Sequence, residues 1–256
     1  MAWYYVVSIV ALVLTFFAGV ILSLKSAGNS PKIKTLLLDA DGTLLDFDRS
    51  EQAALRETFE ALCFPFDSRA YDVYHKNNDA CWKALERGEI TREELKVQRF
   101  RRTFEELGID GDLVLATKTY EGNLSKHAFP FAGAEQTCRR LGKRYDLYIV
   151  TNGLKHVQAA RMAKTEIPNL VKGIYISEDV GFAKPSPEFF DKIFADHPDL
   201  KRKETMIVGD SLSGDILGGN NAEIMTCWVN RNGQPRPEGL RIDVEISDVT
   251  ELERVI

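Results

Sequence analysis

The sequence predicts an α/β fold: a Rossmann-like, doubly wound parallel sheet with an inserted helical cap, preceded by an N-terminal hydrophobic helix. Short apolar runs with strand character recur along the chain and are mostly separated by helix-like stretches. No such run occurs between residues 47 and 129, where amphipathic helical segments follow one another. The 256 residues are 44% hydrophobic and 28% charged, which excludes a disordered or fibrous chain.

The N-terminal stretch Ala2–Leu24 carries no charged residue. A helix of about 23 residues spans roughly 34 Å, enough to cross a hydrocarbon core of about 30 Å. We therefore predict a transmembrane anchor at residues 1–24, in contact with the membrane through residues 2–24, and a linker at residues 25–32, KSAGNSPK. The alternatives are a cleaved signal peptide, a wrongly assigned start and a buried core helix, although the positive n-region typical of a signal peptide is absent.

The charges beside this stretch predict its orientation. Three lysines follow it, and nothing basic except the amino terminus precedes it. The positive-inside rule then keeps the rest of the chain cytoplasmic. The alternatives are a soluble cytoplasmic protein and a protein secreted after signal cleavage.

Five apolar runs are the predicted strands of the sheet. Because they are apolar on both faces, they suit a parallel sheet covered by helices. We assign the core to residues 33–46 and 130–256, and the cap to residues 47–129, which include the amphipathic segments SEQAALRETFEALC and TREELKVQRFRRTFEELG. The predicted strands are Thr35–Leu38, Leu147–Val150, Gly173–Ile176, Thr205–Val208 and Met225–Val229.

Polar signals follow four of these strands. They are DADGT after the first strand, TNG at 151–153, Lys184 in GFAKPSP, and GDSLSGD at 209–215. Each alone is typical of a helix N-cap, a turn or a surface lysine. Ligands of doubly wound sheets bind outside the carboxyl ends of the strands, so four such signals in one chain indicate a functional site.

Charge and cysteine content narrow the class of partner. The net charge is -5, which gives no broad basic field and argues against a nucleic-acid duplex, although a small phosphorylated ligand remains compatible. The four cysteines form no CxxC pair, so neither a zinc site nor a disulfide framework is indicated.

The four motifs DADGTL, IVTNG, AKP and GDSLSGD resemble, in order and strand context, those of the haloacid dehalogenase superfamily. The resemblance covers nearly everything from Lys34 onward. Within the superfamily, the segments HKNNDACWKALERGEIT, ISEDVGFAKP and VGDSLSGDILGGNNAEIMTCWVN are similar to the branch of pyrimidine-type 5'-nucleotidases and N-acylneuraminate-9-phosphate phosphatase. The N-terminal stretch is not part of the family pattern.

The resemblance implies phosphoryl transfer through an aspartyl-phosphate. Asp39 is the expected nucleophile, and Asp41 the acid that protonates the leaving oxygen and then accepts a proton from water. Thr151 and the backbone of Asn152 would hold phosphate oxygens. Lys184 would offset the negative charge. Haloalkanoic dehalogenases lack the second Asp, so its presence favours a phosphatase.

The resemblance also implies Mg²⁺ as the cofactor, because Mg²⁺ prefers carboxylates, water and substrate phosphate in an octahedral shell. The expected protein ligands are Asp39, the backbone carbonyl of Asp41, and Asp210. Asp215 is expected as a metal-shell partner or an orienting residue.

Specificity is expected in the cap, lying over the site as a lid. Asn78 and Trp82 are four apart on one helix face, so an amide and an aromatic ring would meet a base together, with Arg99 as a further polar contact. The alternative is that Trp82 belongs to the cap core and Arg99 to the surface.

We therefore predict a magnesium-dependent phosphomonoesterase that acts on a small phosphorylated metabolite, with a nucleoside 5'-monophosphate as the favoured substrate. The alternatives are a sugar-phosphate phosphatase such as N-acylneuraminate-9-phosphatase, a phosphomutase, and a non-catalytic membrane-tethered binding protein. The sequence does not determine the oligomeric state.

Overall fold

The computed structural model describes residues 32–256. The predicted anchor, residues 1–24, and the predicted linker, residues 25–32 apart from Lys32, lie outside this part of the chain and stay predictions. Among residues 32–256, no helix combines the length and the apolar character needed to cross a bilayer.

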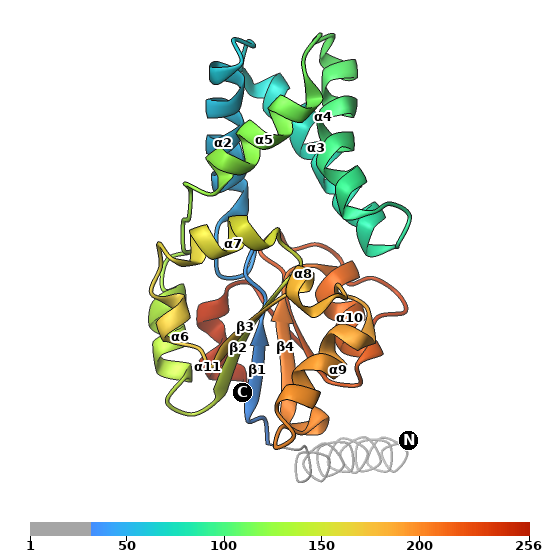
Figure 1. The fold of residues 1–256 in the computed structure, drawn as a ribbon. Coiled ribbons are helices and arrows are strands. Elements are labelled where there is room, and N and C mark those ends of the chain that lie inside the picture. Colours follow the sequence, from blue (N-terminus) through green and yellow to red (C-terminus); the bar gives the residue numbers. More distant parts are fainter. Residues whose placement is uncertain (1–31) are drawn as a thin grey trace, which may run out of the picture. The chain divides into compact units, whose positions relative to one another are not determined.

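The core is a six-stranded parallel sheet in the order β3-β2-β1-β4-β5-β6 (Figure 1). β1 lies in the interior of the sheet between two parallel neighbours, with Thr35 opposite Asp146 on one side and Thr205 on the other. The predicted α/β class and its parallel sheet are confirmed. The strands are β1 (Thr35–Leu38), β2 (Asp146–Thr151), β3 (Gly173–Ile176), β4 (Thr205–Gly209), β5 (Met225–Val229) and β6 (Val244–Ile246). β6 was not predicted, because it has three residues and Glu245 interrupts its apolar pattern.

Helices cover both faces of the sheet. Successive side chains of a strand point to opposite faces, and in β1 Leu36 and Leu38 join one hydrophobic cluster while Leu37 joins the other. The first cluster includes α6 (Ala134–Leu141) and the start of α11 (Leu252–Val255). The second includes α9 (Pro187–Asp196) and the chain just after α10 (Leu217–Asn221). This double cover explains why the interior strands are mostly apolar on both faces.

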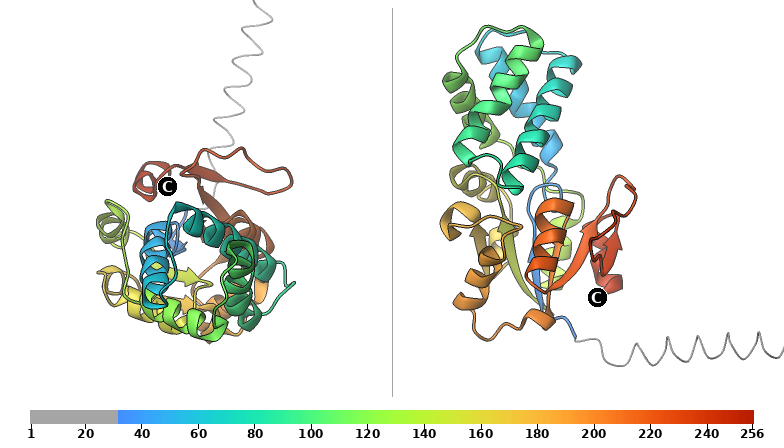
Figure 2. Two further views of the ribbon diagram at one scale, coloured as in Figure 1. Left: turned by 90° about the horizontal axis from the view of Figure 1, so that it is seen from above. Right: turned by 90° about the vertical axis from the view of Figure 1, so that its right-hand side faces the viewer.

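Four helices follow β1 and form the cap, on the side of the carboxyl ends of the strands (Figure 2). They are α2 (Phe47–Ala61), α3 (Ser68–Glu86), α4 (Arg92–Leu107) and α5 (Leu113–Leu124). Each is preceded by a residue whose side chain accepts a backbone N–H of the first turn, which satisfies a donor that the helix leaves open. Their apolar faces share one aromatic-rich cluster, which gives the cap its own hydrophobic core.

Two residues of the cap, Arg92 and Glu86, bind the loops at the strand ends. Arg92, in the first turn of α4, donates to the carbonyl oxygen of Asn152 at 2.9 Å and to Ser177 Oγ at 2.6 Å, where α8 (Ser177–Val180) begins. Glu86, at the end of α3, accepts from Ser213 Oγ in the π-helical turn Leu212–Ile216. The cap therefore contacts the loops after both β2 and β4.

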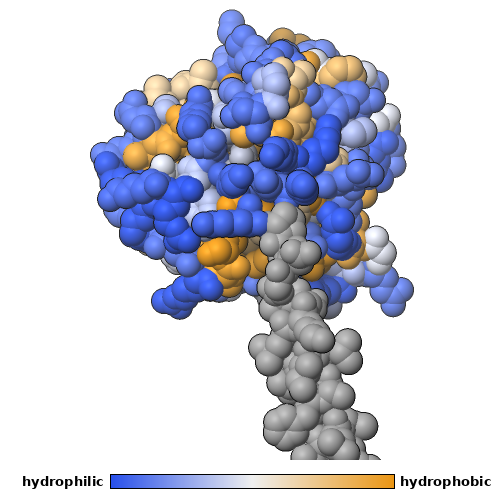
Figure 3. Space-filling view, turned by 90° about the horizontal axis from the view of Figure 1, so that it is seen from below, coloured by the Kyte–Doolittle hydropathy of each residue, from blue (hydrophilic) through white to orange (hydrophobic). Residues whose placement is uncertain are grey.

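The remaining helix of the core, α7 (Lys155–Met162), follows β2 and contacts both sheet and cap. Val157 belongs to the aromatic-rich cluster of the cap, which we call the cap cluster, and Met162 belongs to the first of the two clusters on the sheet. Seen from the end opposite the cap, the visible surface is mostly hydrophilic, with hydrophobic residues in separate groups (Figure 3). Scattered exposed apolar residues of this kind are ordinary for a globular protein.

Candidate functional site

The ammonium group of Lys184 lies at the centre of the site. It donates to Asp39 Oδ1 at 2.6 Å, to Asp215 Oδ1 at 2.6 Å and to the carbonyl oxygen of Val150 at 2.9 Å. These bonds use all three donors of the group. Burial opposes the charge on Lys184, but Asp215 and Asp39 outweigh it, so the pKa of the ammonium is raised. The charge that is predicted to offset Asp39 is thus fixed beside it.

Asp39 follows β1 directly, and its backbone N–H donates to the carbonyl oxygen of Val208 in β4 at 2.9 Å. Asp39 is buried, with 7% of its surface exposed. Burial raises the pKa of the Asp39 carboxyl well above its usual value; Lys184 opposes that rise, and Asp215 and Asp210 add to it. Ionising Asp39 therefore calls for more positive charge than Lys184 supplies.

Three carboxylates supply a place for that charge. Oxygens of Asp39, Asp210 and Asp215 lie within 4.8 Å of one another. Burial and the neighbouring Asp215 raise the pKa of Asp210 to about 7. Negative charge on the three carboxylates is therefore unfavourable, and a bound cation would stabilise it. An all-oxygen donor set suits Mg²⁺. The predicted metal-ligand side chains are therefore brought together.

The turn after β1 leaves room for Asp210 only because residue 42 is a glycine. Gly42 has a φ of 83°, and a Cβ there would lie 2.3 Å from Asp210 Oδ2. Thr43 then donates its hydroxyl to Asp210 Oδ1 at 3.1 Å. Trp228 holds the backbone of the same residue, with Nε1 at 3.0 Å from its carbonyl oxygen. Sequence reasoning missed both supports, although the DGT pattern carries the threonine.

Thr151 ends β2, and the side chain of Asn152 has a use that was not predicted. Its Nδ2 donates to the carbonyl oxygen of Lys184 at 2.8 Å, and the N–H of Lys184 donates back to Asn152 Oδ1 at 2.9 Å. This reciprocal pair fixes the segment that carries the lysine. The backbone of Asn152 thus remains the predicted phosphate contact, while its side chain orients Lys184.

Asp41 does not share the Lys184 cluster. Its carboxylate accepts from Arg161 Nη1 at 2.6 Å and from Gln158 Nε2 at 2.7 Å, both on α7. Sequence reasoning missed both partners. The signal was present in TNGLKHVQAAR, because Gln158 and Arg161 are three residues apart on the helix that follows Thr151 and so share a face.

The predicted cap residues lie elsewhere. Asn78 is buried and donates to Glu51 Oε1 at 2.7 Å, and its Oδ1 lies 3.5 Å from Arg99 Nη1. Arg99 is 2% exposed inside the cap, so the alternative that placed it on the surface is wrong. Trp82 lies on the same helix and is partly exposed. Contact of these three residues with a base stays a prediction.

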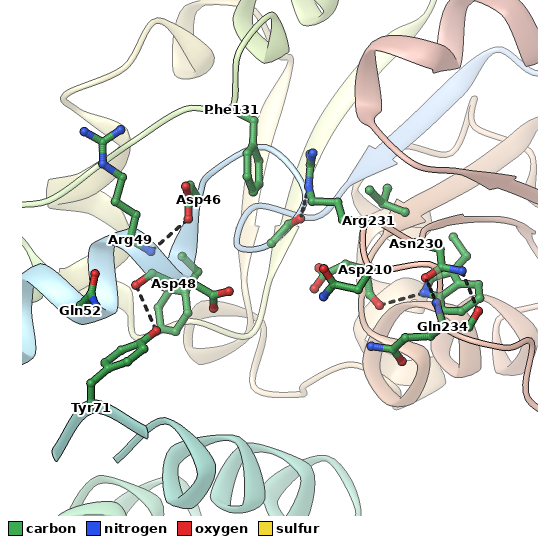
Figure 4. Close-up of a pocket in the computed structure, with 15 residues that line it drawn as sticks. Asp46, Asp48, Arg49, Gln52, Tyr71, Phe131, Asp210, Asn230, Arg231 and Gln234 are labelled. Carbon is green, nitrogen blue, oxygen red and sulfur yellow. Dashed lines mark hydrogen bonds between the residues drawn. The ribbon is translucent and has the colours of Figure 1, made fainter. Parts of the chain in front are cut away.

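A cavity of about 510 Å³ lies beside Asp210 and Gly42 (Figure 4). One wall comes from the start of α2 and from Tyr71 of α3, and the other from the loop after β5. Within residues 32–256 no carboxylate pairs with the guanidinium of Arg49, which lies 4.0 Å above the ring of Phe129. The cavity is lined by aromatic rings, side-chain amides, two arginines and three aspartates. Its polar lining includes Arg49, Gln52, Asn230, Asn232 and Gln234.

Comparison with known proteins agrees with this geometry. The chain is 36% identical to the HAD-hydrolase YfnB of Bacillus subtilis (strain 168), over 88% of this chain and 96% of that protein. A crystal structure of YfnB, described as bound to magnesium and revealing interdomain movement, matches with a TM-score of 0.84 over 88% of this chain and 98% of that chain.

Two relatives carry a more specific name. The chain is 37% identical to the pyrimidine 5'-nucleotidase PynA of Streptococcus pneumoniae (strain ATCC BAA-255 / R6), over 77% of this chain and 84% of that protein. It is 28% identical to the pyrimidine 5'-nucleotidase YjjG of Escherichia coli (strain K12), over 86% of this chain and 96% of that protein. The family model for haloacid dehalogenase-like hydrolases matches residues 33–223, so this chain belongs to the haloacid dehalogenase-like hydrolase family.

Proposed function

We propose that this enzyme is a magnesium-dependent phosphomonoesterase that works through an aspartyl-phosphate on Asp39. The observation that carries the proposal is the buried Asp39 carboxylate, held by Lys184 inside a cluster of three carboxylates. Asp41, two residues on, supplies a second carboxylate at the same strand end. A pocket that had lost turnover would not need both carboxylates as well as the lysine, so the non-catalytic binding protein is the weaker reading.

Two half-reactions follow from this arrangement. In the first, an oxygen of Asp39 attacks phosphorus, the bond to the leaving oxygen breaks, and Asp41 gives that oxygen a proton. In the second, water attacks the phosphoryl group, Asp41 takes the proton of the water, and phosphate leaves Asp39 ionised again. Bound Mg²⁺ would supply positive charge to the phosphoryl oxygens.

Other residues of the chain keep this geometry. Asp39 and Asp210, with the backbone carbonyl of Asp41, would hold the cation, and Asp215 orients Lys184. Thr151 and the N–H of Asn152 lie where β2 ends and would bind phosphoryl oxygens. Lys184 prevents Asp39 and Asp215 from repelling each other.

We propose nucleoside 5'-monophosphates as the preferred substrates, with the nucleoside in the cavity beside Asp210. Support comes from Tyr71, whose ring would stack on a base, and from the cation Arg49, which would bind base carbonyl oxygens. PynA and YjjG, both named pyrimidine 5'-nucleotidases, make a pyrimidine the favoured base. The alternative contacts are those predicted at Asn78, Trp82 and Arg99, within a cap that we assign to residues 47–129.

Phosphate release from a panel of phosphomonoesters tests the proposal. The panel holds nucleoside monophosphates, sugar phosphates and p-nitrophenyl phosphate, each assayed with Mg²⁺ and with EDTA. We expect Mg²⁺-dependent release with the highest kcat/KM on pyrimidine nucleotides, and none from Asp39→Asn, which controls for a contaminating phosphatase. Higher kcat/KM on a sugar phosphate would favour the sugar-phosphate phosphatase, and transfer of phosphate between two positions of one sugar the mutase.

Two substitutions then locate the nucleoside. Tyr71→Ala should raise KM for nucleotides and leave p-nitrophenyl phosphate nearly unchanged, because only the nucleotide carries a base to stack. Trp82→Ala is the matched change in the competing location. A KM increase in Trp82→Ala alone would move the nucleoside from the cavity to the cap helix.

We also propose that residues 2–24 anchor the enzyme, with residues 33–256 on the cytoplasmic side. The support is the uncharged sequence and the lysines that follow it. Fractionation of the full-length protein, followed by protease treatment of sealed vesicles from the cytoplasmic side, tests both parts. Soluble protein with its N-terminus intact would exclude the anchor.

A further inference from the structure

Both oxygens of the Asp41 carboxylate are held by side chains of α7. Arg161 donates to Oδ1 and Gln158 donates to Oδ2, at 2.6 and 2.7 Å. Arg161 and Gln158 are each 1% exposed, whereas the Asp41 side chain is 23% exposed. Two donors on two oxygens fix both the position and the plane of the carboxylate. Each oxygen keeps a second lone pair, so this hold leaves room for a proton in transfer.

Arg161 is itself held by the two segments that connect core and cap. Its Nε donates to the carbonyl oxygen of His127 at 2.9 Å, on the segment that leaves the cap, and Nη2 lies 3.4 Å from Ser50 Oγ, in the first turns of α2. Its guanidinium carbon also lies 5.6 Å from the centre of the Phe47 ring. A guanidinium bound on three sides cannot follow Asp41 if that side chain turns.

Gln158 is fixed just as firmly. Its Nε2 also donates to Thr151 Oγ1 at 2.8 Å, and its Oε1 accepts from Arg161 Nη1 at 3.2 Å. Only a glycine at position 153 allows this approach, because a Cβ there would lie 2.5 Å from Gln158 Nε2. The amide thus links the predicted phosphate-binding threonine to the predicted acid and base.

We propose that Gln158 and Arg161 are positioning residues that hold Asp41 for both of its proton transfers. The inference rests on the proposed function. Asp41 must give a proton to the leaving oxygen and later take one from water, and both transfers depend on an oxygen held within hydrogen-bond reach of the reacting atom. Without these two donors, Asp41 still has its carboxyl group, but that group is no longer held in a fixed position.

Leaving groups of different acidity test the proposal. A nucleoside 5'-hydroxyl leaves only with a proton, whereas p-nitrophenolate is a stable anion and leaves without one. In Arg161→Met we expect kcat/KM for a nucleoside 5'-monophosphate to fall by roughly 10²-fold, the lower end of what a positioned acid contributes. Because kcat/KM for p-nitrophenyl phosphate reports only the first half-reaction, it should stay within about threefold.

The second half-reaction gives an independent readout. With p-nitrophenyl phosphate, kcat of the variant should fall because a misplaced Asp41 activates water poorly, so the phosphoryl-enzyme accumulates. We expect a burst of p-nitrophenol in the first turnover and a phosphoryl adduct in acid-quenched protein. Equal losses of kcat/KM on both substrates without a burst would overturn the proposal, as would no loss on either.

Further variants separate positioning from folding. Gln158→Met removes the second donor at similar size and should show the same pattern, which keeps the proposal falsifiable if Arg161→Met does not fold. Arg161→Lys keeps the charge without the fork of donors and should lie between wild type and Arg161→Met. Val157→Ala on the same helix is the matched control: it shortens a buried side chain of the cap cluster and should lower Tm while the two substrates change alike.

Asp41→Asn distinguishes failure of the inference from failure of the proposed function. It should show the same dependence on the leaving group, with a larger loss. If it does so and the variants of Arg161 and Gln158 do not, the positioning role is wrong. If Asp41→Asn itself treats the two substrates alike, the proposed acid and base is wrong.

Discussion

Lys184 in the core and Arg99 in the cap are both buried cations, but their hydrogen-bond donors are paired very differently. Lys184 and Arg99 are 3% and 2% exposed. Lys184 spends every donor on an oxygen at 2.9 Å or less. In Arg99, Nε and Nη2 have no hydrogen-bond partner within residues 32–256, and Glu121 Oε1 lies 3.6 Å away. The guanidinium instead lies 4.8 Å from the centre of the Tyr120 ring.

The difference teaches that burial of a charge does not by itself mark catalytic machinery. Fully paired donors fix an atom in place, which a nucleophile and its partner require. A guanidinium packed on aromatic rings tolerates small displacements, which is enough to fill the middle of a helical cap. If this is right, substitutions beside Lys184 should have much larger effects than matched substitutions beside Arg99, although both cations are buried equally.

The largest expected effect is on activity. Asp39→Asn should lower kcat by at least roughly 10⁴-fold, because an amide cannot form the acyl-phosphate, while its volume and thus the fold are kept. The matched change in the cap is Glu121→Gln, a carboxyl beside the other buried cation. It should change kcat less than about threefold, since it touches no reacting group. Phosphate release measures both; similar losses would end the distinction.

Lys184→Met should have the largest effect on stability. The change leaves Asp39 and Asp215 facing each other without a cation, and breaking such a buried pair lowers the free energy of unfolding by about 3–5 kcal/mol. Urea unfolding in EDTA measures it, since a divalent cation would mask the loss. Lys192→Met, which removes the exposed partner of Asp196, is the control and should leave the unfolding midpoint nearly unchanged.

Arg99→Met should cost far less, about 1 kcal/mol or less. Its neighbours keep other partners, because Glu121 Oε2 lies 3.4 Å from His156 Nε2 and Glu51 remains bonded to His75 and Asn78. A methionine of similar length fills the volume, and the contact that it removes from Glu121 is a long one, at 3.6 Å. The same urea titration decides it. A loss as large as that of Lys184→Met would show that long contacts fix a charge as well as short ones.

The smallest expected effect concerns the rim of the cap. A hydrogen bond to Glu51 raises the pKa of His75 from 6.5 to about 9, against the effect of its burial. A raised pKa means that the protonated imidazole stabilises the fold fully below pH 6.5, and that this contribution is lost as pH rises through about 9. The Tm difference between wild type and His75→Gln should therefore shrink over this range. A Tm difference that does not vary with pH would show that the ion pair between His75 and Glu51 does not stabilise the fold.

The sequence predicted the parallel sheet and the meeting of Asp39, Lys184, Asp210 and Asp215, because the strand rule places all carboxyl ends at one edge. It did not predict the partners of Asp41. Arg161 is 120 residues from Asp41, and an arginine on an amphipathic helix has the same pattern whether it faces solvent or a carboxylate. The position of Asn78 inside the cap was equally hidden, because helix period locates a face but not what covers it.

Both neighbours of β1 in the sheet, β2 and β4, lie far along the chain from it. Thr35 pairs with Asp146 and with Thr205, and Asp39 binds a lysine 145 residues further along. During synthesis Asp39, the proposed nucleophile, is therefore translated early and Lys184 late, with the whole cap between them. Long-range pairing of this kind makes folding slow. A nascent chain thus carries Asp39 for most of its growth without the lysine that pairs with it.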